Sequence, residues 1–261
     1  MSLLIDADYI VYKCCAATET ENDFGEDLIV VTSNFSDAHG MVERELASIA
    51  SDLGCFDDSI LFFSDSVNFR KSIDPAYKGH RNRKKPCGYK RVINKLKEDY
   101  PVVIMPTLEA DDALGIYATK ESGHILCSPD KDMRQIPGEL FDLSTGVVTI
   151  TPEEGHRWHL IQAMAGDQTD GYAGIPGIGI KRAEALLEAN GATWQTVVDA
   201  FAAKDLDESV ALMNARLAKI LQVEDYDFTN QEPRLWSPSS HRGDDNGAAV
   251  QTQTDRECSP V

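Results

Sequence analysis

Acidic side chains follow the ends of three short apolar runs in this sequence. The run at 3–5 leads into Asp6, the run at 60–63 is followed by Asp65, and the run at 125–127 is followed by Asp130. The carboxyl ends of parallel strands meet at one edge of a sheet, where ligands bind. A single acid at such a position is usually a turn former or a helix cap. Three acids that converge on one edge indicate a site.

Other acids extend this set. Glu109 and Asp112 have the spacing of one face in the first turn of a helix, with Asp111 beside them, and Asp167 and Asp170 flank a glycine-rich segment. Carboxylates gathered in one site repel one another unless cations offset their charge. Oxygen ligands without His or Cys favour Mg²⁺ or Mn²⁺ over zinc. Two such ions about 4 Å apart would form a phosphodiester-cleaving centre. Helix caps and surface acids are the alternative, and they explain some members of the set. The ten candidates are Asp6, Asp8, Asp65, Glu109, Asp111, Asp112, Asp130, Asp132, Asp167 and Asp170.

The net charge conceals a strong polarity along the chain. The 261 residues include 25 Lys and Arg against 43 Asp and Glu, which gives −18 and argues against nucleic-acid binding. Residues 70–97, however, hold eleven basic residues and one acid, a local charge of +10 beside −28 for the remainder. We call residues 70–97 the basic stretch. Tyr77 and Tyr89 lie among its bases, a pattern typical of single-strand binding. A solvated charged face is the alternative.

A glycine-rich segment, GIPGIGIKRA, joins two predicted helices at 174–183. Gly177 and Gly179 allow close backbone approach, and the start of the following helix exposes N–H groups. Lys181 and Arg182 add positive charge, so the segment could bind phosphates of any sequence. Its spacing is not that of a nucleotide-binding loop. A plain helix–helix turn is the simpler alternative.

The elements that must position these residues alternate between strand and helix. Short apolar runs at 3–5, 60–63, 102–105 and 125–127 predict buried strands, and patterns at 37–53, 90–98 and 109–120 predict helices. This order indicates an α/β fold with a mainly parallel sheet. Further helices are predicted at 156–165, 181–190 and within 193–221, followed by a disordered tail over 237–261. We interpret His156 and His159 as structural residues.

No membrane or zinc chemistry is indicated. No apolar run approaches the length of about 18 residues that a membrane span requires. The six cysteines show neither a zinc motif nor the spacing of a disulfide framework, so we expect reduced thiols in the cytoplasm.

Five segments in this order resemble the structure-specific 5′ nucleases, the flap endonuclease and 5′→3′ exonuclease family, and most closely its phage exonucleases. They are LIDADYIVY, FFSDSVNFRKSIDPAYKGHR, LEADDALG, SPDKD and GDQTDGYAGIPGIGIKRA. The resemblance implies a PIN-like nuclease core over 1–155, which includes a basic helical arch at about 70–100. It also implies a DNA-binding region over 156–236 with a helix-hairpin-helix-type module.

The resemblance also assigns roles to individual residues. Lys78 and Arg81 would contact the scissile phosphate, and Tyr77 would stack on a terminal base. Asp8 departs from the pattern of many cellular relatives, which have Asn there. The first metal would be held by Asp6, Asp65, Glu109 and Asp111, and the second by Asp130, Asp132, Asp167 and Asp170, with Asp112 close to both. DNA would be bound by Arg70, Lys71, Arg83, Lys84, Lys85, Gly177, Gly179, Lys181 and Arg182, with K⁺ at the glycine-rich segment.

The function implied is hydrolysis by two Mg²⁺ ions, for which Mn²⁺ can substitute, at 5′ ends of duplex, nicked or flapped DNA and of RNA–DNA hybrids. The enzyme would then act in phage replication, primer removal and recombination. We expect it to be a monomer in the host cytoplasm and to work alongside replication proteins. A PIN-type endoribonuclease and a non-catalytic DNA-junction-binding protein are the alternatives. The endoribonuclease would not need the glycine-rich segment, and the binding protein would not cleave.

Overall fold

A six-stranded sheet forms the centre of the computed structural model, which describes residues 2–54, 59–81 and 84–238. Its strand order is β5-β4-β1-β6-β7-β8, and all neighbours are parallel except β7 and β8. The predicted α/β class with a mainly parallel sheet is therefore confirmed. The strands are β1 (Ser2–Asp6), β4 (Ser59–Phe62), β5 (Val102–Val103), β6 (His124–Cys127), β7 (Gly138–Phe141) and β8 (Val147–Ile150).

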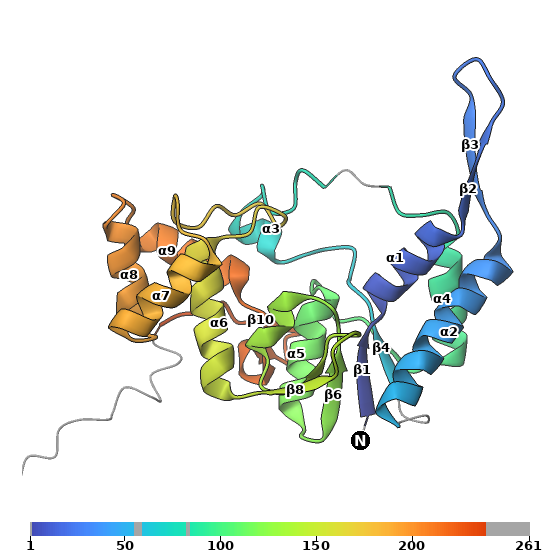
Figure 1. Cartoon of the computed structure of the whole chain (residues 1–261). Helices are drawn as coiled ribbons and strands as arrows, with labels where there is room; N and C mark the ends of the chain where they lie inside the picture. Colours follow the sequence, from blue (N-terminus) through green and yellow to red (C-terminus); the bar gives the residue numbers. More distant parts are fainter. Residues whose placement is uncertain (1, 55–58, 82–83, 239–261) are drawn as a thin grey trace, which may run out of the picture.

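Helices cover both faces of the sheet (Figure 1). Leu3 and Ile5 of β1 pack into one core with helices α1 (Ala7–Ala17), α2 (Phe35–Leu53) and α4 (Tyr89–Asp99). Leu4, on the opposite face of the same strand, packs into a second core with α5 (Ala110–Lys120). The two-residue alternation of a strand thus explains why β1 is apolar throughout. Its polar end at Asp6 is where the chain leaves the sheet.

A helical region lies beside the sheet and comprises α6 (Pro152–Ala165), α7 (Ile180–Asn190), α8 (Trp194–Ala202) and α9 (Glu208–Ala218). Its core contains Leu160, Leu187 and Phe201. His159 is buried, and its Nε2 lies 2.8 Å from the carbonyl oxygen of Ala215, so its predicted structural role is confirmed. Helix α6 runs through residue 155, where the boundary between the nuclease core and the DNA-binding region was predicted. The predicted tail lies, from residue 239 on, outside the described residues.

The chain returns from this region to the sheet after α9. Ile220, Leu221 and Tyr226 pack into the core around α5, close to the short helix η2 (Val223–Asp225). The last strands, β9 (Tyr226–Asp227) and β10 (Glu232–Pro233), form a small antiparallel pair. Among the described residues, no helix is long and apolar enough to cross a membrane.

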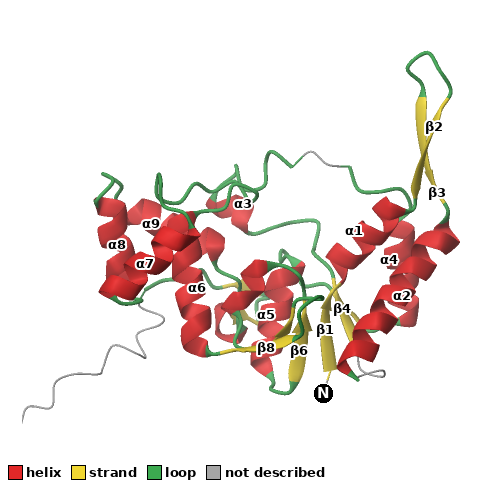
Figure 2. Cartoon of the chain, in the orientation of Figure 1, coloured by secondary structure: helices red, strands yellow, loops and turns green. Residues whose placement is uncertain are grey.

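The basic stretch contains two helices separated by irregular chain (Figure 2). Helix α3 (Arg70–Ile73) is a single turn, and α4 begins only at Tyr89. The described residues between them form turns and extended chain, so the prediction of a helical arch is wrong for this segment. Pro75 and Pro86 disfavour helix, and Gly88 has φ +79°. Helix α4 packs through Val92 and Leu96 into the core. Arg83 lies outside the described residues.

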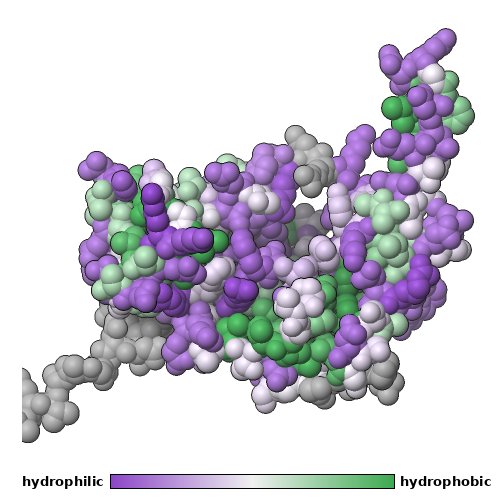
Figure 3. Space-filling view, viewed as in Figure 1, coloured by the Kyte–Doolittle hydropathy of each residue, from purple (hydrophilic) through white to green (hydrophobic). Residues whose placement is uncertain are grey.

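A projecting hairpin, which the sequence pattern does not predict, lies between α1 and α2. Its strands are β2 (Glu19–Asp23) and β3 (Ile29–Ser33), and within the described part of the chain they pair only with each other. Phe24 at its tip is 68% exposed, and apolar and hydrophilic side chains both lie on its surface (Figure 3). The sequence ETEND has no apolar alternation, which removed the signal for a strand.

Candidate active site

One cavity of about 1230 Å³ opens at the carboxyl ends of β1 and β6. The predicted convergence of acids at this edge is present, with contributions from four parts of the chain. Lys78, Arg81 and Lys85 of the basic stretch also line the cavity. The acids that line it are Asp6, Asp8, Glu109, Asp111, Asp130, Asp132, Asp167 and Asp170.

Asp6 and Asp111 bring the strongest charge repulsion into this cavity. Asp6 caps α1 by accepting the amide of Tyr9, and Ser128 Oγ donates to its Oδ2 at 2.9 Å. Burial raises the pKa of Asp6 to about 6 even though Ser128 opposes the shift. Burial, followed by the charges of Asp6 and Asp130, raises the pKa of Asp111 well above its ordinary value. A cation bound between these carboxylates would relieve the repulsion.

Lys78 neutralises the carboxylates on one side of the cavity. Its Nζ hydrogen-bonds to Glu109 Oε1 and lies 3.6 Å from Asp170 Oδ2. Burial acts to raise the pKa of Glu109, but Lys78 and Arg70 outweigh it and hold the pKa at about 2. Arg81 Nη2 donates to Asp170 Oδ1 at 2.7 Å. Basic side chains therefore occupy positions next to the carboxylates that the sequence analysis assigned to metal ions.

Tyr77 supports this side of the cavity from within the core. Its hydroxyl lies 3.0 Å from Glu109 Oε2 and 2.9 Å from Asp170 Oδ2. Its side chain is only 2% exposed, so the prediction that it stacks on a terminal base is wrong for this structure. The hydroxyl positions two acids instead.

Lys131, for which no role was predicted, neutralises the carboxylates on the other side of the cavity. Its Nζ lies 2.9 Å from Asp132 Oδ1 and 2.8 Å from Asp167 Oδ2. The buried amide of Gln162 on α6 also donates to Asp132. Asp130 accepts the amide of Asp132 at 2.9 Å. The position of Lys131 between two acids in SPDKD could have indicated that it belongs to the site. No sequence pattern indicated Gln162, because α6 contacts this loop only in the folded chain.

Asp112 and Arg70 form a buried ion pair, which corrects two predictions. Arg70 Nη1 and Nη2 donate to the two oxygens of Asp112 at 2.7 and 2.8 Å, and both side chains are at most 1% exposed. Arg70 Nε also donates to the carbonyl of Leu217. Asp112 is therefore not a free metal ligand, and Arg70 is not a DNA-binding residue. Neighbouring positions 111 and 112 point to different surroundings because they lie on a helix.

Asp65 is not among the residues that line the cavity, although its neighbour Ser64 is, so its place at the first metal stays a prediction. Its oxygens accept the backbone amides of Thr107 at 2.8 Å and Ser66 at 2.6 Å, so it stabilises a turn after β4. Asp8 lines the cavity instead. Its carboxylate accepts the amide of Ser64 and the hydroxyl of Tyr89.

The glycine-rich segment lies at the start of α7. Gly177 has φ +78°, a conformation that favours glycine, and Gly179 is the N-cap residue. No side chain of the described residues caps this helix by a hydrogen bond. Lys181 is exposed, and Arg182, also exposed, donates to the carbonyl of Gly177. Lys71, Lys84 and Lys85 are exposed on the basic stretch.

Residues 1–155 match the family model described as the N-terminal resolvase-like domain of 5′-3′ exonuclease. The chain belongs to the 5′-3′ exonuclease family. The exodeoxyribonuclease of Enterobacteria phage T3 is 28% identical across 91% of this chain and 93% of that protein. The exonuclease of Escherichia phage T7 is also 28% identical, across 90% and 93%. The resemblance to phage 5′ nucleases is confirmed, and the comparisons support 5′-3′ exonuclease or flap endonuclease activity.

Solved structures support the same fold. The T5 5′-exonuclease, determined with bound divalent metal ions (zinc), matches with a TM-score of 0.59 at 17% identity, over 83% of this chain and 88% of that chain. The catalytic core of Rad2 in complex with a DNA substrate matches with a TM-score of 0.51 at 12% identity, over 80% and 66%. The predicted PIN-like fold is confirmed.

Proposed function

We propose that this chain is a divalent-metal-dependent nuclease that hydrolyses phosphodiester bonds at the 5′ ends of duplex, nicked or flapped DNA. One observation carries the proposal: eight carboxylates converge in a cavity that the basic stretch also lines. Nuclease chemistry needs both negative and positive side chains, because the carboxylates hold cations and the basic side chains attract phosphate.

The donor set fits hard divalent ions. All of its anionic groups are carboxylates, and the raised pKa values of Asp6 and Asp111 mark where negative charge lacks compensation. Two bound Mg²⁺ ions would supply a metal-activated hydroxide and stabilise charge on the attacking and leaving oxygens; Mn²⁺ could replace them. We assign one ion to Asp6, Glu109, Asp111 and Asp130, and the other to Asp132, Asp167 and Asp170 with Asp130 shared.

The basic side chains in the cavity have a second task in this proposal. Lys78, Arg81 and Lys131 pair with carboxylates that bound cations would neutralise. Their charge then becomes available to the scissile phosphate, which they orient and stabilise. The backbone of Lys78 is fixed for this task, because its amide donates to the carbonyl of Asp170 at 2.7 Å.

Binding of the substrate divides between two surfaces. The basic stretch would hold the 5′ single strand through Lys71, Lys84 and Lys85, and the segment from Gly177 to Arg182 would hold duplex phosphates, with K⁺ as an additional ligand. Residues 156–236 would therefore form the duplex-binding region. A T5 flap endonuclease complex with DNA and metal ions supports DNA as the substrate. RNA–DNA hybrids, phage replication, primer removal, recombination, replication-protein partners, a monomeric state and the host cytoplasm remain part of the proposal.

Cleavage of 5′-labelled blunt, nicked, flapped and RNA–DNA substrates in Mg²⁺ tests the proposal. We expect a ladder of short 5′ products that EDTA abolishes. Asp111→Asn should lower the rate more than about 100-fold, since even outer-shell changes cost 10- to 100-fold. Asp52→Asn is the control, because Asp52 is an exposed acid on α2 that does not line the cavity, and it should retain the wild-type rate.

Three results would contradict the proposal. Full activity of Asp111→Asn would show that the carboxylates of the cavity do not form the catalytic centre. Cleavage of single-stranded RNA without a preference for duplex DNA would favour an endoribonuclease. Tight binding to junctions without cleavage in any divalent ion would leave only a DNA-binding protein.

A further inference from the structure

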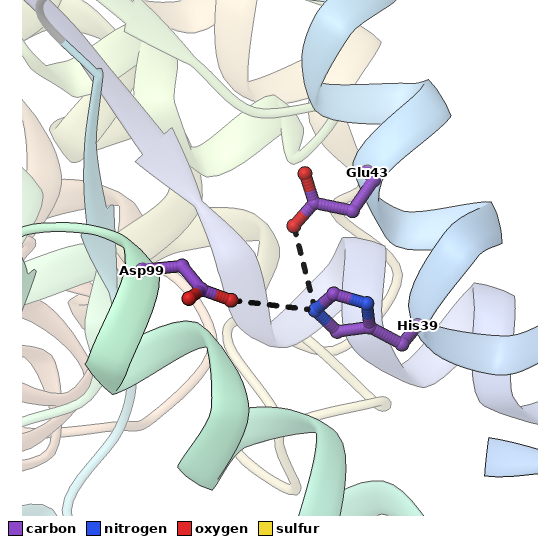
Figure 4. Close-up of side chains that lie close together, drawn as sticks. All are labelled: His39, Glu43 and Asp99. Carbon is purple, nitrogen blue, oxygen red and sulfur yellow. Dashed lines mark ion pairs between the residues drawn. The ribbon is translucent and has the colours of Figure 1, made fainter. Parts of the chain in front are cut away.

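A second group of metal-ligating side chains lies outside the active-site cavity. His39 and Glu43 stand one turn apart on α2, and Asp99 is the last residue of α4 (Figure 4). None of the three lines the active-site cavity. They join two helices that cover the same face of the sheet.

Two distances within this group are close to those between ligands around one ion. His39 Nε2 lies 3.5 Å from Glu43 Oε1 and 3.7 Å from Asp99 Oδ2, and the three atoms lie within 4.8 Å of one another. Zinc bonds of about 2.0–2.2 Å in a tetrahedral arrangement place ligand atoms roughly 3.3–3.6 Å apart. His39 Nε2 and Glu43 Oε1 are also buried and have no hydrogen-bond partner. Buried polar atoms without a hydrogen-bond partner are costly, and either a bound ion or the ion pair of a protonated His39 with Glu43 would offset that cost.

Neighbouring donors orient both carboxylates. The Tyr100 hydroxyl donates to Glu43 Oε2 at 2.9 Å, and Lys95 Nζ lies 2.7 Å from Asp99 Oδ1. In each carboxylate the other oxygen is the one that faces the imidazole (Figure 4). Metal sites commonly fix their ligands by such outer hydrogen bonds.

We propose that His39, Glu43 and Asp99 bind Zn²⁺ and clamp α4 to α2, with water in the fourth position. The imidazole nitrogen distinguishes this site from the carboxylate-only cavity, because Zn²⁺ accepts nitrogen ligands that Mg²⁺ avoids. Helix α4 directly follows the irregular part of the basic stretch, so the ion would anchor that end of the stretch to the core. The competing interpretation is a charged His39 that pairs with two acids and binds no metal.

The test adds ZnCl₂ to the full-length protein in excess Mg²⁺, which occupies carboxylate-only sites. Imidazole ¹⁵N resonances, with His39 assigned through His39→Gln, report binding at this residue directly. We expect a shift of the His39 Nε2 resonance and a rise in the thermal midpoint. Glu43→Gln should weaken zinc affinity more than about 10-fold and abolish the rise. Glu45→Gln, a half-buried acid on the same helix that pairs with Lys13 and not with His39, should keep both effects.

Asp99→Asn provides a second variant if Glu43→Gln folds poorly, and it should also lose the zinc-dependent shift. An unchanged His39 resonance in wild-type protein would overturn the proposal and leave an ion pair only. Wild-type zinc affinity in both acid variants would overturn it as well. Because the readout is at His39, this result does not depend on nuclease activity.

Discussion

Two adjacent acids, Asp111 and Asp112, should respond in opposite ways to the same substitution. Asp112→Asn removes the charge that faces Arg70, whose guanidinium donates to both Asp112 oxygens at 2.7 and 2.8 Å. Both side chains are buried, so the arginine would remain charged without its main partner. Breaking a buried pair from one side costs about 3–5 kcal/mol.

This cost is large enough to measure by thermal or chemical denaturation. For a chain of this size, each kcal/mol shifts the midpoint by roughly 2–4 °C, so Asp112→Asn should lower it by about 6–20 °C. Asp111→Asn is the control. Burial and neighbouring acids raise the pKa of Asp111, so loss of its charge should leave metal-free stability unchanged or higher. Its nuclease activity should fall.

A double variant separates loss of the pair from loss of packing. Arg70→Met with Asp112→Leu removes both charges and should recover part of the stability that Asp112→Asn loses, because no uncompensated charge remains. An Asp112→Asn variant that keeps the wild-type midpoint but loses activity as Asp111→Asn does would refute this prediction. Asp112 would then act at the metal centre.

Three further predictions concern the cavity, the basic stretch and the glycine-rich loop. The folded-state pKa of Asp6 is about 6, above its ordinary 3.8, so metal-free protein loses stability as pH rises through 6. Asp6→Asn in EDTA should therefore melt higher than wild type above pH 6, with no difference below pH 3.8. Replacing Lys84 and Lys85 by Ala should reduce the slope of log affinity against log salt by about 1.4 on DNA with a 5′ single-stranded flap, about 0.7 for each contact; an unchanged slope would place the single strand elsewhere. Gly174→Ala should lower the melting midpoint, since its Cβ would lie 2.3 Å from a backbone nitrogen at φ +62°. Gly179→Ala, with open space within 4 Å, should melt like wild type.

Part of the site could be predicted from local pattern alone. Apolar runs that end in acids placed Asp6 and Asp130 at the carboxyl edge of parallel strands, and the structure has them there. Asp167 and Asp170, which the family resemblance assigned to the same site, also line the cavity. The inference about Asp6 and Asp130 succeeded because strand direction and chain order determine where strand ends meet.

Other predictions failed because they depended on contacts between distant segments. Tyr77 has the sequence context of a stacking residue, but its ring is buried and its hydroxyl joins Glu109 and Asp170. Lys131 pairs with Asp167 only in the folded chain, because Asp167 follows α6 and is distant from Lys131 in the sequence.

The sequence by itself determined the fold class, the edge of the sheet that carries the acids and the segment that carries the positive charge. These features follow from residue type and periodicity, which act over a few neighbouring residues. The tertiary structure alone decided which acids share the cavity and which are neutralised by a buried arginine. Asp111 and Asp112 show why: one residue of helix rotation turns a side chain by about 100°, so adjacent carboxylates meet different neighbours.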